Sequence, residues 1–329
     1  MAASSCSDRL PAASPLVKID LCRRPGECTR MSAAFIDCTD DMIAAWEAIR
    51  RPADPAVALH MANGQPGDVP ARIDGHRAAI VDHTYFDAGL LQRCTGLQHI
   101  VFLGTGASSF IDVDAAAKLG IAVHTIKGYG DITVAEHTIA LALAAARDVA
   151  RMDREVRAGQ WRQIAGVQLR GKTFGIIGLG GIGQEVARMA EGLGMRVLAW
   201  NRSPTDRPTV PLDAVLAGAD ILCICLALTD ATRGFLDADK LTRTKPGVIF
   251  VNTARADLVD NAALADLLRR GHIRHAAIDV FAREPPDPAD PLLVLSNVTL
   301  TAHAGFMTPE ATETMLRRAM DLVIEHDGP

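Results

Sequence analysis

The sequence predicts an α/β protein with two parallel β-sheets. The chain has 329 residues, enough for two domains of ordinary size. From residue 33 onward, short apolar runs alternate with stretches in helical spacing, which is the order of a parallel sheet covered by helices. No period of roughly 20–50 residues recurs, so a solenoid is not expected.

The first series of elements extends to about residue 122. The predicted strands are Ala33–Asp37, Val57–Met61, Ala78–Asp82, His99–Leu103 and Ile121–Thr125, and the predicted helices are Ala44–Arg50, Phe86–Cys94 and Val113–Leu119. Residues 1–30 show neither helical nor strand periodicity, so we expect a poorly ordered extension. Because the first strand follows Met31 so closely, a translation start at Met31 is a second hypothesis.

The second series is stronger and begins with a long helix, predicted from about Val134 to Ala158. The strands predicted after it are Thr173–Gly178, Arg196–Trp200, Ile221–Leu226, Val248–Asn252, Ala276–Asp279 and Val298–Thr301, with helices at Ile182–Leu193, Leu212–Leu216, Asp237–Thr242 and Ala262–Arg270. Six parallel strands with helices between them predict the doubly wound α/β fold.

Composition excludes several classes of function. The formal net charge is −5 with 22% charged residues, so no basic excess points to nucleic acid. The most apolar helical stretch, Val134–Ala146, contains Glu136 and His137 and is shorter than the ~20 apolar residues that a membrane span needs. The first thirty residues hold no apolar block long enough for a signal peptide. We therefore expect a cytoplasmic protein that binds neither nucleic acid nor membrane.

Cysteine and histidine usage argues against a disulfide framework and a metal site. The seven cysteines are an odd number and include no Cys-x-x-Cys pair. The histidines are scattered without ligand spacing, so positions at the surface or at strand ends are expected for them. They are His60, His76, His83, His99, His124, His272 and His275.

A glycine loop carries the sharpest local signal. Gly178-Leu179-Gly180-Gly181-Ile182-Gly183 follows a predicted strand and opens a predicted helix, the order of a dinucleotide-binding loop. Gly178 permits a tight turn, Gly180 lets the backbone approach a pyrophosphate, and Gly183 allows close packing of the helix, whose N-terminus favours an anion. A tight turn without a ligand is the alternative.

The end of the next strand bears on the choice of dinucleotide. An NAD site would place an acidic residue there for the ribose hydroxyls, but the sequence reads Asn201-Arg202-Ser203. All three side chains can donate to a 2′-phosphate, and a hydrogen bond to a charged group contributes about 1.5–3 kcal/mol. We therefore expect NADPH to be favoured over NADH. The alternative is that Arg202 is only a solvated loop residue.

Three polar residues follow late strands, at the edge where open α/β sheets bind ligands. They are Arg255, Glu284 and His303. Singly, each could be an ordinary surface or strand-end residue. Beside a dinucleotide they form a hydride-transfer set, in which a cation polarises a carbonyl, a histidine delivers a proton and a carboxylate favours the protonated histidine. Reduction should then weaken as the pH rises through the apparent pKa of the pair.

At these motifs the sequence resembles the D-isomer-specific 2-hydroxyacid dehydrogenases, from about Phe35 to Asp321. The segments that carry the resemblance are Thr133–Thr138, Gly178–Gly183, Leu228–Gly234, Asn252–Arg255, Asp279–Pro285 and Thr301–Gly305. The resemblance implies a dinucleotide-binding Rossmann domain, residues 123–304, inserted into a smaller flavodoxin-like substrate domain, residues 31–122 plus 305–329. It also implies a homodimer built around the long helix.

The resemblance also implies residue roles. Arg255 would hold a 2-oxo acid, His303 would be the general acid in reduction, and Glu284 would pair with His303. Asp279 would bind the nicotinamide carboxamide, although it could simply cap a strand end. The further cofactor contacts implied by the resemblance are Ile182, Thr232 and Thr253.

The substrate carboxylate is expected at Leu103–Ser108, where Thr105 and Gly106 leave backbone N–H groups for an anion. Here the chain departs from the family pattern. It has Ser108-Ser109 where many members have an Asp, and it is one residue longer before Ile111. Ala256 and Ala227 are smaller departures, from Gly and Pro. Phe306 and Met307 could wall the pocket or pack in the core. Substrate choice is the property that these departures affect.

Three functions fit the sequence. The first is NADPH-dependent reduction of a small 2-oxo acid, of the glyoxylate or hydroxypyruvate type, to the D-hydroxy acid. The second is a biosynthetic dehydrogenase for a larger or phosphorylated acid, which the lack of a further domain after the last helix makes less favoured. The third is a non-catalytic dinucleotide sensor resembling the corepressors built on this fold.

Overall fold

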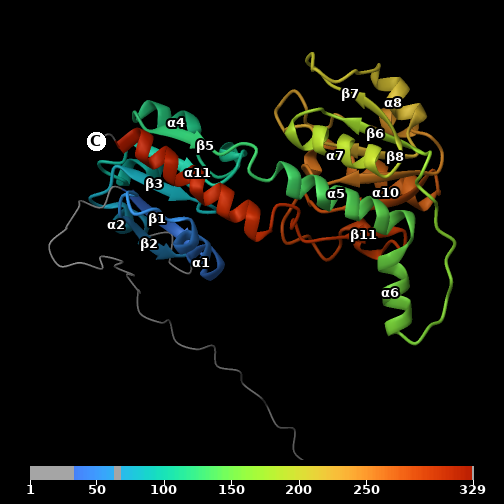
Figure 1. The fold of residues 1–329 in the computed structure, drawn as a ribbon, viewed down its shortest axis with the longest axis horizontal. Helices are drawn as coiled ribbons and strands as arrows, with labels where there is room; N and C mark the ends of the chain where they lie inside the picture. Colours follow the sequence, from blue (N-terminus) through green and yellow to red (C-terminus); the bar gives the residue numbers. More distant parts are fainter. Residues whose placement is uncertain (1–32, 63–67, 328–329) are drawn as a thin grey trace, which may run out of the picture. The chain divides into compact units, whose positions relative to one another are not determined.

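The computed structural model describes residues 33–62 and 68–327 (Figure 1). The extension expected over residues 1–30, and the hypothesis of a start at Met31, lie outside the described residues. The chain divides into two compact units, one running to Lys127 and resuming at Thr312, the other being Gly128–Ala311. The sequence predicts domain divisions at 122–123 and 304–305.

The first unit holds a five-stranded parallel sheet in the order β2-β1-β3-β4-β5, the strand order of flavodoxin-like folds. Its strands are β1 (Ala33–Cys38), β2 (Val57–Met61), β3 (Ala78–Val81), β4 (His99–Phe102) and β5 (Ala122–Thr125), and its helices are α1 (Asp40–Ile49), α2 (Val69–Ile73), α3 (Ala88–Arg93), α4 (Val113–Lys118) and most of α11 (Pro309–Asp327). The short helix α2 is not predicted, because five residues that include Pro70 give no readable period.

Alternating strand residues build this unit's two layers. Ile36 and Ile100 pack with Phe86 and Leu91 in one core, whereas Phe35, the neighbour of Ile36, has its ring 5.8 Å from that of Trp46 in α1. Successive side chains of a strand point to opposite faces, so each face of the sheet is covered by helices.

The second unit holds a six-stranded parallel sheet in the order β11-β10-β9-β8-β6-β7. Its strands are β6 (Thr173–Ile177), β7 (Arg196–Trp200), β8 (Ile221–Ile224), β9 (Val248–Asn252), β10 (Ile273–Ile278) and β11 (Val298–Leu300), and its helices are α5 (Asp131–Ala146), α6 (Val149–Arg157), α7 (Gly181–Gly192), α8 (Leu212–Gly218), α9 (Ala238–Thr242) and α10 (Asn261–Arg269). β7 is added on one side of β6, and β8 to β11 are added in turn on the other side. The strand order therefore reverses between β6 and β8, and open α/β sheets bind ligands at such a switch point.

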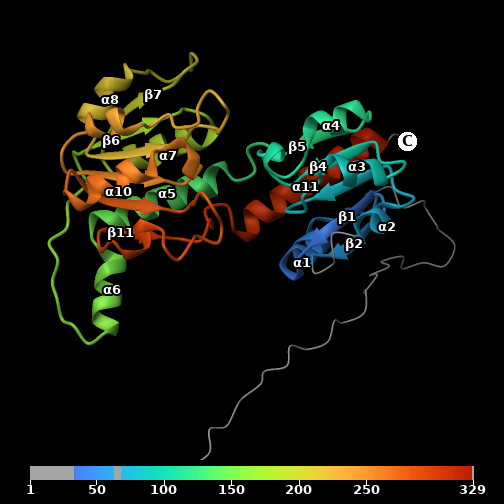
Figure 2. The same ribbon diagram turned by 180° about the vertical axis from the view of Figure 1, so that it is seen from behind.

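Two cores sandwich this sheet. Ile177 and Ile224 belong to the core with helices α8, α9 and α10, and Ile176 and Cys223 belong to the core with α5 and α7. Figures 1 and 2 show α7 and α10 on opposite faces of the sheet. Both predicted sheets are present, and the predicted α/β fold class is confirmed.

The prediction of one long helix from Val134 to Ala158 is wrong. The helix is interrupted at Arg147 and Asp148, between α5 and α6. Asp148 adopts left-handed backbone angles, φ 52° and ψ 35°, and its carboxylate lies 3.3 Å from Nδ1 of the buried His275. A long-range polar contact therefore overrides the local helical pattern, because a buried imidazole requires a polar partner.

Two other expectations can be compared with the described residues. Within 33–62 and 68–327, no helix is long and apolar enough to cross a membrane. The expected surface or strand-end position is wrong for His60 and His275, since both lie within strands and both are buried.

Candidate active site

The late strands of the second unit end in one row. Asn252, Ile278 and Leu300 are register partners on β9, β10 and β11. Arg255 and His303 each follow this row by three residues, and Glu284 lies in the loop after β10. Parallel strands carry all three predicted catalytic residues to the same edge of the sheet, the carboxyl edge.

Glu284 and His303 form a direct pair. Nδ1 of His303 lies 2.7 Å from Oε2 of Glu284, while the other carboxylate oxygen of Glu284 accepts the backbone N–H of Phe281 at 3.0 Å. An ionised carboxylate only accepts hydrogen bonds, so Nδ1 carries its proton and Nε2 is the nitrogen left for substrate. The ring of Phe306 meets the His303 ring edge-on, with centroids 6.0 Å apart, and Met307 is exposed.

The loop that carries His303 is held by Asp279. His303 has a left-handed backbone, φ 50°, which few non-glycine residues adopt. Its N–H donates to the backbone oxygen of Asp279 at 2.7 Å. Four donors surround the Asp279 carboxylate, namely Thr301 Oγ1 at 2.6 Å, Ala304 N at 2.9 Å, Gly305 N at 3.0 Å and His137 Nε2 at 3.4 Å.

These contacts decide the charge of Asp279. Burial raises the pKa of its carboxyl group, but the hydrogen bonds from His137, Thr301 and two backbone N–H groups outweigh burial and lower the pKa to about 2. Its two oxygens are both engaged by the protein. The structure thus gives Asp279 a positioning role for the His303 loop, and the predicted contact with the nicotinamide carboxamide stays a prediction.

Arg255 is fixed by a neighbour that the sequence analysis did not single out. The side chain of Asn252 donates to the backbone oxygen of Arg255 at 3.0 Å and accepts the N–H of Ala254 at 3.0 Å. Nη1 of Arg255 donates to the oxygen of Ala254 at 2.7 Å, and Arg255 makes no ion pair with any residue in the described ranges. This leaves a half-buried guanidinium with unused donors, suited to a carboxylate or a carbonyl oxygen.

The glycine loop has the steric properties that a dinucleotide requires. Gly178 has a φ of 105°, and a Cβ on Gly183 would come 2.0 Å from the backbone oxygen of Gly178. A Cβ on Gly180, the residue that caps α7, would meet nothing within 4 Å. Gly180 is therefore not demanded by packing within the protein. The first turn of α7, which includes Ile182, has backbone N–H groups without a helical partner, and the Asp131 carboxylate occupies the space that a Cβ on Gly181 would need.

The segment after β7 lines a surface pocket of about 530 Å³, formed by residues 201–209. Within it, Arg202 is exposed and has no ion-pair partner among the described residues, whereas Arg207 is held by Glu191 at 2.6 Å. The Asn201 side chain accepts the N–H of Leu179 at 2.9 Å and donates to the oxygen of Ser203 at 2.8 Å. Asn201 thus ties the glycine loop to this segment, and Arg202 is the group best placed to meet an anion.

The hydroxyl groups of Thr232 and Thr253 are used inside the protein. Thr232 Oγ1 donates to the oxygen of Ala227 at 2.7 Å, within its own loop. Thr253 Oγ1 lies 2.7 Å from Oγ1 of Thr138 in α5. Their predicted contacts with a cofactor stay predictions.

The predicted carboxylate loop lies in the first unit, after β4. Gly104 donates its N–H to the oxygen of Phe102 at 2.9 Å, but the N–H groups of Thr105 and Gly106 have no partner in the part of the chain that the structure describes. Asp112, three residues after Ser109, caps α4 by accepting the N–H of Ala115 at 2.9 Å. The loop thus retains two free donors for an anion.

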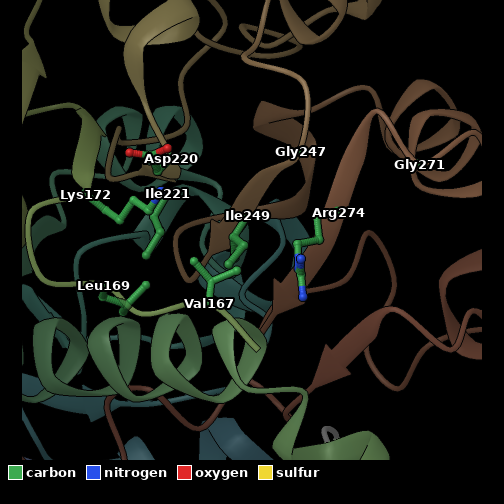
Figure 3. Close-up of a pocket in the computed structure, with 9 residues that line it drawn as sticks. All are labelled: Val167, Leu169, Lys172, Asp220, Ile221, Gly247, Ile249, Gly271 and Arg274. Carbon is green, nitrogen blue, oxygen red and sulfur yellow. The ribbon is translucent and has the colours of Figure 1, made fainter. Parts of the chain in front are cut away.

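A second pocket of about 460 Å³ lies at the opposite edge of the six-stranded sheet (Figure 3). Its lining includes Lys172, Asp220 and Gly247, which directly precede β6, β8 and β9. Amino ends of parallel strands share one edge, so this pocket is separate from the carboxyl edge that carries the glycine loop and the Glu284–His303 pair.

Three of the ten histidines gather in the first unit, which the expectation of scattered histidines did not foresee. His99 and His124, from β4 and β5, meet His326 of α11, with rings 4.1–5.4 Å apart. The fold thus brings His99 and His124 together with His326, although their positions in the sequence show no ligand spacing, and the expectation of no metal site stays a prediction.

Comparison with known proteins identifies the family. Residues 139–305, just over half of the chain, match the model for the D-isomer specific 2-hydroxyacid dehydrogenase, NAD binding domain. The chain belongs to the D-isomer-specific 2-hydroxyacid dehydrogenase family. The family resemblance given by the sequence motifs is confirmed, and residues 139–305 form a domain for a nicotinamide dinucleotide.

Relatives with names and structures agree with this family. The chain is 40% identical over 250 residues to a glyoxylate reductase of Aeropyrum pernix, covering 71% of this chain and 73% of that protein. It is 40% identical over 237 residues to a D-3-phosphoglycerate dehydrogenase of Archaeoglobus fulgidus, of which it spans 45%. The crystal structure of a glyoxylate reductase from Paecilomyes thermophila matches with a TM-score of 0.77 and 29% identity over 88% of this chain and 93% of that one.

Sequence reasoning missed the residues that position the site. Asn252, His137 and Thr301 carry no reactive role of their own and gain meaning only through long-range contacts. A usable signal existed, because Asn252 ends an otherwise apolar strand and His137 interrupts an apolar helix. Polar residues in such places are hydrogen-bonded in folded proteins.

Proposed function

We propose that this family member reduces a small 2-oxo acid, of the glyoxylate or hydroxypyruvate type, to the D-2-hydroxy acid with NADPH. The observation that supports this proposal most directly is the contact between Nδ1 of His303 and Oε2 of Glu284, which lie 2.7 Å apart. This pair lies at the same edge of the sheet as Arg255 and the glycine loop. The names glyoxylate reductase and glycerate dehydrogenase among the relatives support this substrate class.

Bound NADPH supplies the hydride, and side chains of the protein bind the substrate, polarise its carbonyl group and donate the proton. Arg255 holds the oxo acid through its unused guanidinium donors and polarises the carbonyl. Nε2 of His303 gives a proton to the carbonyl oxygen as the alcohol forms. Glu284 accepts from Nδ1, which fixes the orientation of the ring and leaves Nε2 for the substrate.

The residues present fit a dinucleotide. Gly180 leaves open space beside the start of α7, and a helix N-terminus suits a pyrophosphate. Arg202, without an ion-pair partner among the described residues, supports a preference for the 2′-phosphate of NADPH, together with Ser203 and the remaining N–H of Asn201. Ile182, Thr232, Thr253 and Asp279 are proposed as further contacts.

The test is turnover with a panel of acids. Oxidation of NADPH and NADH would be followed with glyoxylate, hydroxypyruvate and pyruvate, and the reverse reaction with D-3-phosphoglycerate. We expect the highest kcat/KM with NADPH and a two- or three-carbon oxo acid. Preference for D-3-phosphoglycerate would instead favour a biosynthetic dehydrogenase for a larger or phosphorylated acid. The phosphoglycerate dehydrogenases among the relatives support this second candidate function. Tight NADPH binding without turnover would favour a sensor.

We also propose a homodimer formed through the second unit. Apolar side chains are exposed on α6 and just beyond it, where Val149 is 51%, Val156 50% and Trp161 85% exposed. Exposed apolar side chains gathered on one region are typical of an interface. Sedimentation should give twice the chain mass, and Trp161→Ser should weaken the association; a monomer at micromolar concentration would contradict the proposal. A cytoplasmic location stays a prediction from composition.

A further inference from the structure

Three imidazoles from distant parts of the sequence meet in the first unit. His99 begins β4 and His124 lies in β5. In the parallel register His124 pairs with Val101, and Val101 lies two residues from His99, so both histidines point to the same face of the sheet. His326, in the last turn of α11, stacks on both rings, with centroids 5.1 Å and 4.1 Å away.

The spacing of the nitrogens is close to that of a metal site. One ring nitrogen from each histidine can be chosen so that all three lie within 4.8 Å of one another, and Nδ1 of His99 is 3.2 Å from Nε2 of His124. In a tetrahedral zinc site with bonds of about 2.0–2.1 Å, ligand nitrogens are about 3.4 Å apart. Nitrogens up to 4.8 Å apart would have to approach one another by up to about 1.4 Å to reach this spacing. Rotation about χ1 and χ2 of the three half-buried side chains can supply such a movement.

The chemistry of the group favours a cation over any other ligand. Neutral imidazole is a preferred ligand of zinc and of its neighbours in the first transition row. Burial lowers the pKa of His124, and the neighbouring His326 and His99 lower it further. The carboxylate of Glu325 is close enough to favour positive charge there.

We propose that His99, His124 and His326 bind a divalent transition-metal ion, with zinc as the first candidate, through three imidazole nitrogens and a water molecule. This site belongs to the first unit and is independent of the reductase activity proposed above. A bound ion links the last turn of α11 to β4 and β5. It therefore stabilises the packing of a helix whose sequence position is about two hundred residues from the strands that it joins.

The experiment is zinc titration of the full chain, without an affinity tag and after chelator treatment. Calorimetry should show one high-affinity site per chain, and saturating zinc should raise the thermal unfolding midpoint by roughly 5 °C. The double variant His124→Gln/His326→Gln should lose both effects, and the single variant His326→Gln should weaken both. The matched control is His272→Gln, which removes a half-exposed imidazole of the second unit and should change neither.

Cysteine thiolates could also bind zinc, and the absorption spectrum of bound cobalt distinguishes thiolate ligands from imidazole ligands. Cobalt bound to three imidazoles and water gives visible d–d bands without a thiolate charge-transfer band. Equal zinc binding by the wild type and the double variant, or a thiolate band with cobalt, would overturn the proposal. So would the absence of zinc binding by the wild type. Circular dichroism of the variants without metal establishes that they are folded.

Discussion

Two regions at the same edge of the second unit are built in opposite ways. The loop that carries His303 is tied to the buried Asp279 carboxylate by three of its own donors, and His137 of α5 is a fourth donor to the same carboxylate. The segment after β7, with Arg202, is exposed and is tied mainly by Asn201 and by the Arg207–Glu191 pair. Proton transfer needs a group fixed to a fraction of an ångström, whereas a surface phosphate can be met by a long flexible cation.

The largest effect is expected from His303→Gln. Loss of the general acid should lower kcat/KM by about 100- to 10,000-fold, while NADPH affinity, measured by fluorescence, should change little. Activity within threefold of the wild type would show that His303 does not donate the proton. The rigid anchoring of its loop would then have no catalytic purpose.

Asp279→Asn tests the anchoring itself. The folded-state pKa of Asp279 is about 2, against an ordinary value of 3.8. A lowered folded-state pKa stabilises the fold above the unfolded-state pKa, and this contribution is lost as the pH falls through the folded-state pKa. The variant should therefore lose about 2 kcal/mol of unfolding free energy at pH 7, measured by urea denaturation, and kcat should fall as well.

The control for this variant is Asp266→Asn, which removes an exposed carboxylate paired with Arg270 four residues away. Exposed pairs contribute little, so both stability and kcat should stay near the wild type. If Asp279→Asn behaved like this control, the loop would not depend on the buried carboxylate.

Arg202→Ala tests the role of the exposed segment after β7. We expect the ratio of NADPH to NADH efficiency to fall about tenfold, because one charge-assisted hydrogen bond to the 2′-phosphate is lost. Stability should stay unchanged, since the side chain is exposed. Arg207→Ala removes a guanidinium from the same pocket that is already paired with Glu191, and it should alter the ratio less. Equal ratios for both variants would contradict a specific role for Arg202.

Glu284→Gln should have the smallest effect. The amide oxygen can still accept from Nδ1 of His303, but the hydrogen bond to an uncharged acceptor is weaker, so kcat/KM for reduction should fall less than in the variants above. The measurement is kcat/KM for reduction from mildly acidic to alkaline pH. A profile that overlays that of the wild type would mean that the 2.7 Å contact does not tune the histidine.

The sequence was sufficient where the signal is local. Apolar runs located all eleven strands of the described residues to within a few positions, because buried parallel strands are nearly continuous hydrophobic segments. The predicted catalytic residues fell at the carboxyl edge for the same reason, since strand ends in a parallel sheet share one edge.

Features that depend on distant contacts could not be read from the sequence. The break between α5 and α6 follows from Asp148 meeting His275, which lies 127 residues further along the chain. Asp279 was readable as a strand-end acid, but three of its four donors come from the loop after β11 and the fourth, His137, comes from α5. The His99–His124–His326 group has no spacing motif at all, because its members come from separate strands and a helix.

The first unit is assembled from two stretches of chain, and this has a consequence for its biosynthesis. Arg317 of α11 pairs with the buried Asp54 at 2.6 Å, and Met315, Leu316 and Met320 are buried in the same unit. Gly128–Ala311 is continuous and can fold as soon as it has left the ribosome. The strands made earlier must wait, with one face covered by α1 but not yet by α11, until the last helix has been translated.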